Sequence, residues 1–521
     1  MTDLSFYGRS LRKRFIGVRL LLTTAALACG VTFIGGSNFE PEASQKIDPA
    51  VWRHISKDQN PKALNNEVLI KVRGKADLSA AAQFQSREER GQYVFTTLTA
   101  HADQSQADLV AYLREHAISF QAFYITNLIA ASGVSAEQIR TLSQRPDVEK
   151  IYANPQVKMS PPIKSPELES PAKGIGANIT KTGADQVWSR YHIKGAGIVI
   201  ANQDTGMQWD HPALKAHYRG WNAATGTASH DYNWHDAIKQ SLGNGETNKC
   251  GYNLQVPCDD DQHGSHTTGT VIGDDGGDNK IGMAPEATWI GCRNMDSGIG
   301  KPSSYIDCFE FFLAPYPLNG DPRRDGDPRK APHVINNSWG CSTDEGCSAD
   351  EIVPVLEALK AAGIFVVASA GNDGSSCSTI KDPPAYHSAL TFSVGAFDHR
   401  SGTIASFSSR GPSTFDNAIG PDVSAPGVSV RSSVPGGAYD GSFSGTSMAG
   451  PHVVGAVALL WSADRSLIGN IEATSDVLRN TSDAKTSSQT CGGVSGSARP
   501  NNTYGYGNLN ILAAVQSRLG M

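Results

Sequence analysis

Three residues of this 521-residue chain have the types and surroundings needed for nucleophilic chemistry. Asp204 follows an apolar run at 197–201, His263 lies between polar turn residues and a run of small residues, and Ser447 precedes an apolar stretch at 451–460. A serine hydroxyl becomes a strong nucleophile when a histidine accepts its proton and a buried aspartate orients that histidine. Together the three residue types predict an acyl-transfer apparatus, provided that the fold brings them into contact.

Ser447 taken alone is better explained as a helix cap, because serine is a preferred N-cap residue. A hydroxyl at the start of a helix also lies near unpaired N–H groups, which favour developing negative charge. We expect Pro451 to lie in the first turn of this helix, where its missing N–H has no cost. Asp204 shifts the interpretation toward catalysis, because it ends a predicted buried strand and open parallel sheets gather their sites at the carboxyl ends of strands.

Three short motifs resemble the signatures of subtilisin-like serine proteases, the subtilases of peptidase family S8. They are Asp-Thr-Gly at 204–206, His-Gly-Ser-His at 263–266 and Gly-Thr-Ser-Met-Ala at 445–449. Their order along the chain, Asp then His then Ser, is also the order known for subtilisin. Segments 207–214 and 336–340 most resemble the bacillopeptidase F branch. The resemblance covers residues 175–521 nearly end to end.

This resemblance implies a catalytic role for four residues. Ser447 would attack the scissile carbonyl, and His263 would take its proton and later give it to the leaving amine. Asp204 would hold the imidazole in the required tautomer. Asn372, within the segment 369–373, would stabilise the oxyanion together with the backbone N–H of Ser447. No cofactor is expected for this reaction.

The resemblance also implies two segments that flank the pocket for the substrate side chain preceding the cut. Small residues there leave room for the substrate backbone to pair as an added strand. Trp339 fits a pocket wall and core packing equally well. The expected substrate-binding residues are Ser338, Trp339, Gly340, Ser369, Ala370 and Gly371.

Other polar residues near the motifs have simpler explanations. His266 is expected to be structural, and His452 would point away from Ser447 on a helix. The acidic run at 259–261 is expected to be a solvated loop. Residues 274–279 carry oxygen ligands and turn residues suited to calcium, although they lack the spacing of a recognised calcium loop. A structural calcium is therefore an expectation without named ligands.

The elements that must position these residues fall into two folded regions. Residues 45–159 contain strand-like runs, such as 67–72 and 124–130, helix-like stretches at 105–116 and 135–145, and a final strand-like run at 148–151. Ser135 with Gln138 predicts a capping box for the second helix. The pattern strand-helix-strand-strand-helix-strand indicates a small α+β domain. It resembles the I9-like inhibitory propeptide of the family, which would act as an intramolecular inhibitor and folding template.

A proline-rich segment at 160–174 separates this domain from the rest and is expected to be an extended, protease-accessible linker. Residues 175–521 then alternate buried strands with helices. The apolar runs at 197–201, 333–336 and 364–368 and the helical stretches at 349–362 and 448–463 favour a parallel sheet covered on both faces. The fold class is α/β, a subtilisin-like three-layer α/β/α arrangement with a mostly parallel central sheet.

The first 36 residues have the pattern of an export signal. A stretch with five basic residues precedes the apolar run 20–34, and small residues offer cleavage points. An uncleaved membrane anchor is the alternative, and Ala28-Cys29 loosely resembles a lipoprotein processing site. We expect a secreted protein, either extracellular or periplasmic.

The cysteines support export. Eight of the nine follow residue 249, and an even set suits disulfides in an oxidising compartment. Zinc is less well supported, because no Cys-x-x-Cys pair is present. Close spacing suggests the pairs Cys250–Cys258, Cys292–Cys308 and Cys341–Cys347, which leaves Cys377–Cys491.

Composition and motif order weigh against other functions. The net charge of −6 and the absence of a long basic run after residue 20 do not suggest a nucleic-acid partner. An esterase or lipase would have the order Ser, acid, His and a Gly-x-Ser-x-Gly elbow, from which 445–449 departs in its last residue. A non-catalytic scaffold would be expected to have lost at least one of the four catalytic residues. We expect a monomeric endopeptidase acting on proteins or peptides.

Overall fold

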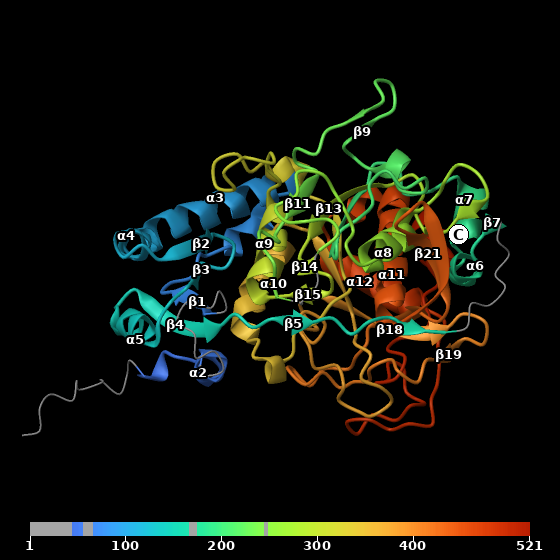
Figure 1. Cartoon of the computed structure of the whole chain (residues 1–521). Coiled ribbons are helices and arrows are strands. Elements are labelled where there is room, and N and C mark those ends of the chain that lie inside the picture. The colour runs from blue at the N-terminus through green and yellow to red at the C-terminus, as the bar shows by residue number, and fades with distance from the viewer. Residues whose placement is uncertain (1–43, 56–65, 166–173, 244–247, 521) are drawn as a thin grey trace, which may run out of the picture. The chain divides into compact units, whose positions relative to one another are not determined.

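A mostly parallel sheet forms the centre of the C-terminal region of the chain (Figure 1). The computed structural model describes residues 44–55, 66–165, 174–243 and 248–520. Within these residues the sheet has eight strands, of which only β19 (Thr403–Ile404) is antiparallel to its neighbour. The parallel strands are β11 (Trp234–Asp236), β13 (Thr288–Arg293), β8 (Val199–Asp204), β16 (Val334–Asn337), β17 (Phe365–Ser369), β18 (Phe392–Asp398) and β20 (Val423–Pro426).

Two hydrophobic clusters cover the two faces of this sheet. Helices α9 (Pro302–Leu313) and α10 (Ala349–Ala361) pack against one face, where Ala201 and Ile335 point. Helices α8 (His263–Ile272), α11 (Thr446–Ala463) and α13 (Ile511–Leu519) pack against the other, where Ile200 and Val334 point. Neighbouring residues of a strand face opposite sides, so both faces are apolar. The predicted three-layer α/β/α fold is confirmed.

The N-terminal region is a four-stranded antiparallel sheet with strand order β2-β3-β1-β4. The strands are β1 (Glu67–Val72), β2 (Ser119–Phe123), β3 (Leu128–Ser132) and β4 (Val148–Ala153). The helices are α2 (Pro49–Ile55), α3 (Arg87–Ser105), α4 (Ala107–Glu115) and α5 (Ala136–Gln144). The capping box of Ser135 and Gln138 is present at the start of α5, as predicted.

One predicted strand in this region is partly wrong. Residues 124–127 form a turn, and β3 begins only at Leu128. The backbone N–H groups of Tyr124 and Ile125 donate to the buried Glu310 carboxylate of α9, at 2.6 and 3.0 Å. A contact between distant parts of the chain therefore overrides the local strand preference.

The helix α3 was not predicted from the sequence. It begins after Ser86, whose hydroxyl accepts from the backbone N–H of Glu89, while the Glu89 carboxylate accepts from the Ser86 N–H. This Ser-x-x-Glu pattern is a capping box and is visible in the sequence.

Four disulfides join the cysteines in the predicted pairs. Cys377–Cys491 closes the longest loop, with a sequence separation of 114 residues. The predicted export signal at 1–36 lies outside the described residues. Within the part of the chain that the structure describes, no helix has the length and apolar character needed to cross a membrane.

Candidate active site

Asp204 and His263 are in direct contact in the interior of the protein. Asp204 is the last residue of β8 and His263 is the first residue of α8, and both are fully buried. The Nδ1 atom of His263 lies 2.8 Å from Oδ1 of Asp204 and 2.9 Å from Oδ2. The backbone N–H of Thr205 and the hydroxyl of Thr267 also donate to this carboxylate, at 2.7 and 3.2 Å. The imidazole is therefore held with Nε2 available for chemistry.

The charges around His263 favour its protonated form. Burial alone would lower the pKa of His263, but the carboxylates of Asp204, Asp261 and Asp259 outweigh burial and raise the pKa above its ordinary value of 6.5. An imidazolium is thus stabilised in a position where it would form during proton transfer.

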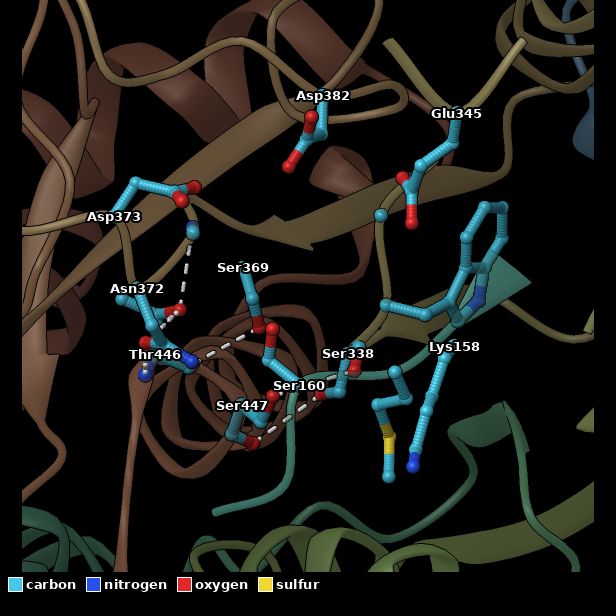
Figure 2. Close-up of a pocket in the computed structure, with 14 residues that line it drawn as sticks. Lys158, Ser160, Ser338, Glu345, Ser369, Asn372, Asp373, Asp382, Thr446 and Ser447 are labelled. Carbon is cyan, nitrogen blue, oxygen red and sulfur yellow. Dashed lines mark hydrogen bonds between the residues drawn. The ribbon is translucent and has the colours of Figure 1, made fainter. Parts of the chain in front are cut away.

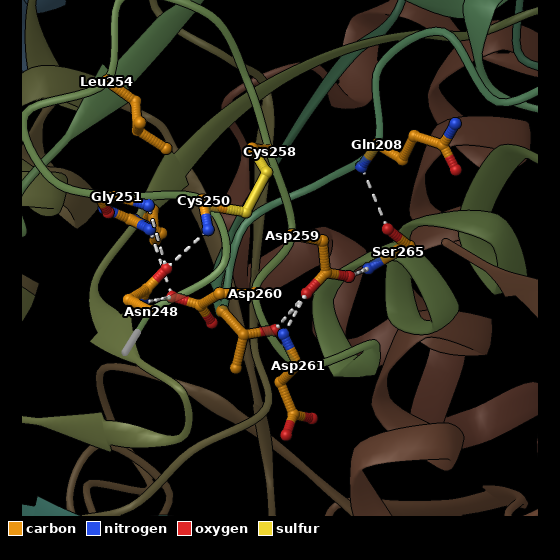
Figure 3. Close-up of a disulfide and its surroundings, with 12 residues drawn as sticks. Gln208, Asn248, Cys250, Gly251, Leu254, Cys258, Asp259, Asp260, Asp261 and Ser265 are labelled. Carbon is orange, nitrogen blue, oxygen red and sulfur yellow. Dashed lines mark hydrogen bonds and ion pairs between the residues drawn. A yellow bond between two sulfur atoms is a disulfide. The ribbon is translucent and has the colours of Figure 1, made fainter. Parts of the chain in front are cut away.

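The acidic run at 259–261 is not the solvated loop that the sequence predicts. Asp259 is 3% exposed, and its carboxylate accepts hydrogen bonds from backbone N–H groups just before α8 and in its first turn (Figure 3). The donors are Asp261 N at 3.1 Å, Gln262 N at 3.0 Å, Ser265 N at 2.8 Å and the hydroxyl of Thr205 at 2.9 Å. Asp259 thereby fixes the start of α8, and with it His263.

The neighbouring acid Asp260 is also buried. It pairs with the fully buried guanidinium of Arg293 at 3.1 Å. Figure 3 shows Asp260 close to the Cys250–Cys258 disulfide. Asp259 and Asp260 thus both anchor the loop that leads to His263. Buried carboxylates of this kind need such partners, because an unpaired buried charge is costly.

Ser447 lies at the start of α11, as predicted, but Pro451 lies in the second turn rather than the first, because the helix begins at Thr446. Pro451 cannot donate to the carbonyl of Ser447, the partner that an ordinary helix residue would use. The hydroxyl of Ser338 donates to that carbonyl instead, at 3.2 Å. A side chain from the end of β16 thus replaces the missing helix bond beside the candidate nucleophile.

The Ser447 hydroxyl donates to the carbonyl of Ser338, at 3.3 Å. The Nε2 atom of His263 has no hydrogen-bond partner among the described residues. The expected Ser447–His263 hydrogen bond is therefore not formed here. Rotation about the Cα–Cβ bond of Ser447 moves its hydroxyl between staggered positions, and such bonds often tighten only when substrate is bound.

A chain of buried amides links the two helix starts. Asn336 donates to the Ser338 hydroxyl at 3.0 Å and to the side chain of Asn202 at 2.9 Å. Asn202 in turn donates to the carbonyl of Gly264 at 3.2 Å, directly after His263. The starts of α8 and α11 thus meet at the carboxyl ends of β8 and β16, where parallel sheets place their sites.

Asn372 follows β17 and lies beside the start of α11. Its side-chain oxygen accepts from the backbone N–H and the hydroxyl of Thr446, both at 2.9 Å. The amide nitrogen is therefore the group left to donate to a bound ligand.

A cavity of about 110 Å³ adjoins Ser447 and Asn372 (Figure 2). Five of the six predicted substrate-binding residues line it, namely Ser338, Trp339, Gly340, Ser369 and Gly371. Ala370 does not line it, because its side chain packs into a small apolar cluster. Trp339 serves both of its expected roles, since it lines the cavity and also stacks on Tyr305 with ring centroids 3.9 Å apart.

Residues 157–165, which overlap the start of the predicted linker 160–174, cross this site. Residues 166–173 of that linker lie outside the described residues. At one side β5 (Val157–Lys158) pairs with β15 (Ile299–Gly300), and the N–H of Met159 donates to the carbonyl of Gly298 at 2.7 Å. At the other side β6 (Ile163–Lys164) pairs with β22 (Ala438–Ser444). Residue Ser160 lines the same cavity as Ser447. The crossing segment is thus an added strand at each side of the candidate nucleophile, the geometry of a bound peptide.

The other candidate residues are packed or internally paired. His266 stacks on Phe443 and His452 bonds Met448 O and Asn178, and burial lowers the pKa of each imidazole to about 3. In the suspected calcium loop, the Asp275 carboxylate accepts from Gly277 N, Asn279 N and the Asn279 side chain. Over the described ranges, no group of three or more His, Cys, Asp or Glu residues is arranged to hold a metal ion.

Comparison with known proteins agrees with this geometry. A family model described as the subtilase family matches residues 195–507, more than half of the chain. Bacillopeptidase F of Bacillus subtilis (strain 168) is 34% identical over 476 residues, which cover 88% of this chain but 30% of that protein. Subtilisin E of the same strain is 34% identical over 266 residues, 50% of this chain and 57% of the relative. The chain thus spans less than two thirds of the length of either relative.

Proposed function

The chain belongs to the subtilase family, and on that basis we propose that it is a serine endopeptidase with Ser447 as nucleophile, His263 as general base and acid, and Asp204 as the orienting carboxylate. The observation that carries the proposal is the 2.8 Å contact between His263 and the fully buried Asp204. Ser447 begins a helix at the same edge of the sheet. Beside a serine hydroxyl, a buried pair of this kind can activate the hydroxyl as a nucleophile.

The reaction follows from these groups. Ser447 Oγ attacks the scissile carbonyl carbon while its proton passes to Nε2 of His263, and the carbonyl oxygen becomes an oxyanion. The amide of Asn372 and the N–H of Ser447 donate to that oxyanion. His263 then protonates the leaving amine, and water releases the acyl group from Ser447 by the same steps.

The protein is proposed to be a zymogen that is exported and then cuts itself. Support comes from the segment 157–165, which lies across the cavity as an added strand, and from the four disulfides, which suit an oxidising compartment. The domain at 45–159 would then act as inhibitor and folding template, because parallel sheets depend on distant contacts and fold slowly. A monomeric state and a structural calcium at 274–279 remain predictions.

Labelling with a fluorophosphonate probe tests the proposal. The matured protein should carry one adduct at Ser447, located by mass spectrometry, and His263→Ala should abolish labelling. An adduct on another serine, or labelling that survives His263→Ala, would refute the assignment.

A further inference from the structure

The cavity beside Ser447 is strongly acidic. Among the residues that line it, three carry carboxylates, and they come from separate segments of the chain. Figure 2 shows the side chains of Asp373, Asp382 and Glu345 reaching the cavity from different sides, opposite Ser447 and Ser338. Cavities that accept apolar side chains are lined mainly by hydrophobic residues.

The cations near this cavity only partly offset these charges. Lys381 pairs with Asp373 at 3.3 Å, and both side chains are about 40% exposed. Lys158 of the crossing segment also lines the cavity, but Figure 2 shows its side chain pointing away from the three carboxylates. Among the described residues Asp382 forms no salt bridge, although the charge of Lys381 acts on its carboxylate.

Asp382 is the carboxylate that most needs a ligand. Its Oδ1 atom is inaccessible to solvent and has no hydrogen-bond partner within the described residues. Trp339, only 5% exposed, also lines the cavity with an unpartnered indole N–H. A buried carboxylate without a cation partner is unfavourable, so a positively charged group in the adjoining cavity would stabilise Asp382.

Gly340 allows Asp382 to approach the cavity. A Cβ atom on Gly340 would lie 2.9 Å from Cβ of Asp382, closer than two such carbons can approach. Gly340, which was predicted to leave room for the substrate backbone, thus leaves room for the Asp382 side chain as well.

We propose that this cavity binds a lysine or arginine side chain of the substrate residue that precedes the scissile bond, with Asp382 as the main specificity-determining residue. This inference rests on the proposed function, since it assumes that Ser447 is the nucleophile. The aliphatic stem of the substrate side chain would lie along Trp339 and Gly340, and its charged end would reach the carboxylates. Ser160, which lines the cavity in the precursor, has a side chain too short to fill it.

The test uses protein matured from the full-length chain and peptides that differ only in the residue before the cut: arginine, lysine, leucine or phenylalanine. We expect kcat/KM to be at least about tenfold higher for arginine and lysine than for leucine, the effect of one charge-assisted contact. Asp382→Asn should lower the arginine-to-leucine ratio by about tenfold or more.

Asp476→Asn is the matched control, because it removes the same charge at an exposed position that neither lines the cavity nor is among the charges that shift the pKa of Asp382. It should leave the ratio unchanged. Glu345→Gln provides a second cavity variant should Asp382→Asn fail to fold, and it should lower the ratio in the same direction. Fluorophosphonate labelling of Ser447 reports whether each variant retains an intact site.

The outcomes separate the two proposals. A wild-type protein that labels at Ser447 but prefers leucine or phenylalanine would overturn the specificity and leave the protease assignment intact. An unchanged ratio in both cavity variants would also overturn it. Absence of labelling together with absence of cleavage would instead defeat the proposed function itself.

Discussion

The side-chain oxygen of Asn372 accepts two hydrogen bonds from Thr446, one from its backbone N–H and one from its hydroxyl. These bonds fix the plane of the Asn372 side-chain amide on Thr446, the residue that precedes the candidate nucleophile Ser447. They also decide which end of the amide is free, because an occupied oxygen leaves the NH₂ group as the donor. Thr446 therefore positions Asn372, the proposed oxyanion donor, and Ser447 follows Thr446 in the chain.

Replacing Asn372 by alanine should lower kcat by about 10²–10³, a magnitude that was measured for the corresponding donor of subtilisin itself. KM should change little, because the oxyanion exists only along the reaction path. Steady-state kinetics on a peptide substrate measure both quantities. The exposed Asn480→Ala serves as control, and near-normal turnover of Asn372→Ala would show that another group stabilises the oxyanion.

The acid limb of the pH–rate profile should lie above pH 6.5, because neighbouring carboxylates raise the pKa of His263 above that value. His263 must be neutral to accept the serine proton, so activity is lost as the pH falls through this raised pKa. Asp261→Asn removes one of these charges without touching the Asp204 contact. It should move the limb of kcat/KM to lower pH and leave activity at alkaline pH nearly unchanged. A limb that stays in place would show that Asp261 does not act on His263.

The preference for basic side chains should itself depend on pH. Burial, followed by the charge of Asp373, raises the pKa of Asp382 to about 6, with Glu345 and Asp344 acting in the same direction and Lys381 against them. Below about pH 6 the carboxyl is protonated and attracts a cation less. The arginine-to-leucine ratio of kcat/KM should therefore fall as the pH drops through 6. Titration of His263 affects both peptides equally and cancels in the ratio, so a constant ratio would contradict the assignment.

The sequence predicted those parts of the site that are determined by residues close together in the chain. The apolar runs located β8, β16 and β17, and the motifs at their ends located Asp204, Ser338 and Asn372. The capping box predicted α5 correctly, and the same pattern at Ser86 would have located α3.

The missed features depend on contacts between distant residues. The turn at 124–127 requires Glu310, which lies 185 residues beyond Ile125. The burial of Asp259 requires the start of α8 to fold back onto its carboxylate. The acidic cavity combines three segments that no local pattern connects. In physical terms, hydrophobic periodicity and caps act over a few residues, whereas burial of a charge is decided by the tertiary fold.

Ser447→Ala should accumulate as an uncut precursor after export, because the segment 157–165 crosses the cavity of the same molecule. In the wild-type protein, N-terminal sequencing should place the new N-terminus within residues 160–163, between β5 and β6. This cut follows a residue that is not basic, and we expect it because strand pairing already holds the attached segment at the site. Adding a trace of active enzyme to the Ser447→Ala precursor shows whether cutting also occurs between molecules. Normal processing of the variant in the absence of that enzyme would mean that a different protease matures the chain.

Substitutions of Ser338 and of Pro451 should have interdependent effects on the free energy of unfolding, because both residues affect the hydrogen bonding of the Ser447 carbonyl. Ser338→Ala removes the only hydroxyl that bonds this carbonyl in the described part of the chain, and an unsatisfied buried acceptor costs about 1–3 kcal/mol. Pro451→Ala restores an N–H that can form the ordinary helix bond to the same carbonyl. The double variant should therefore recover part of the stability lost in Ser338→Ala.

Urea denaturation in the Ser447→Ala background, which prevents self-digestion, measures the four free energies of unfolding. Additive effects of the two substitutions would show that the Ser338 hydroxyl does not replace the missing helix bond.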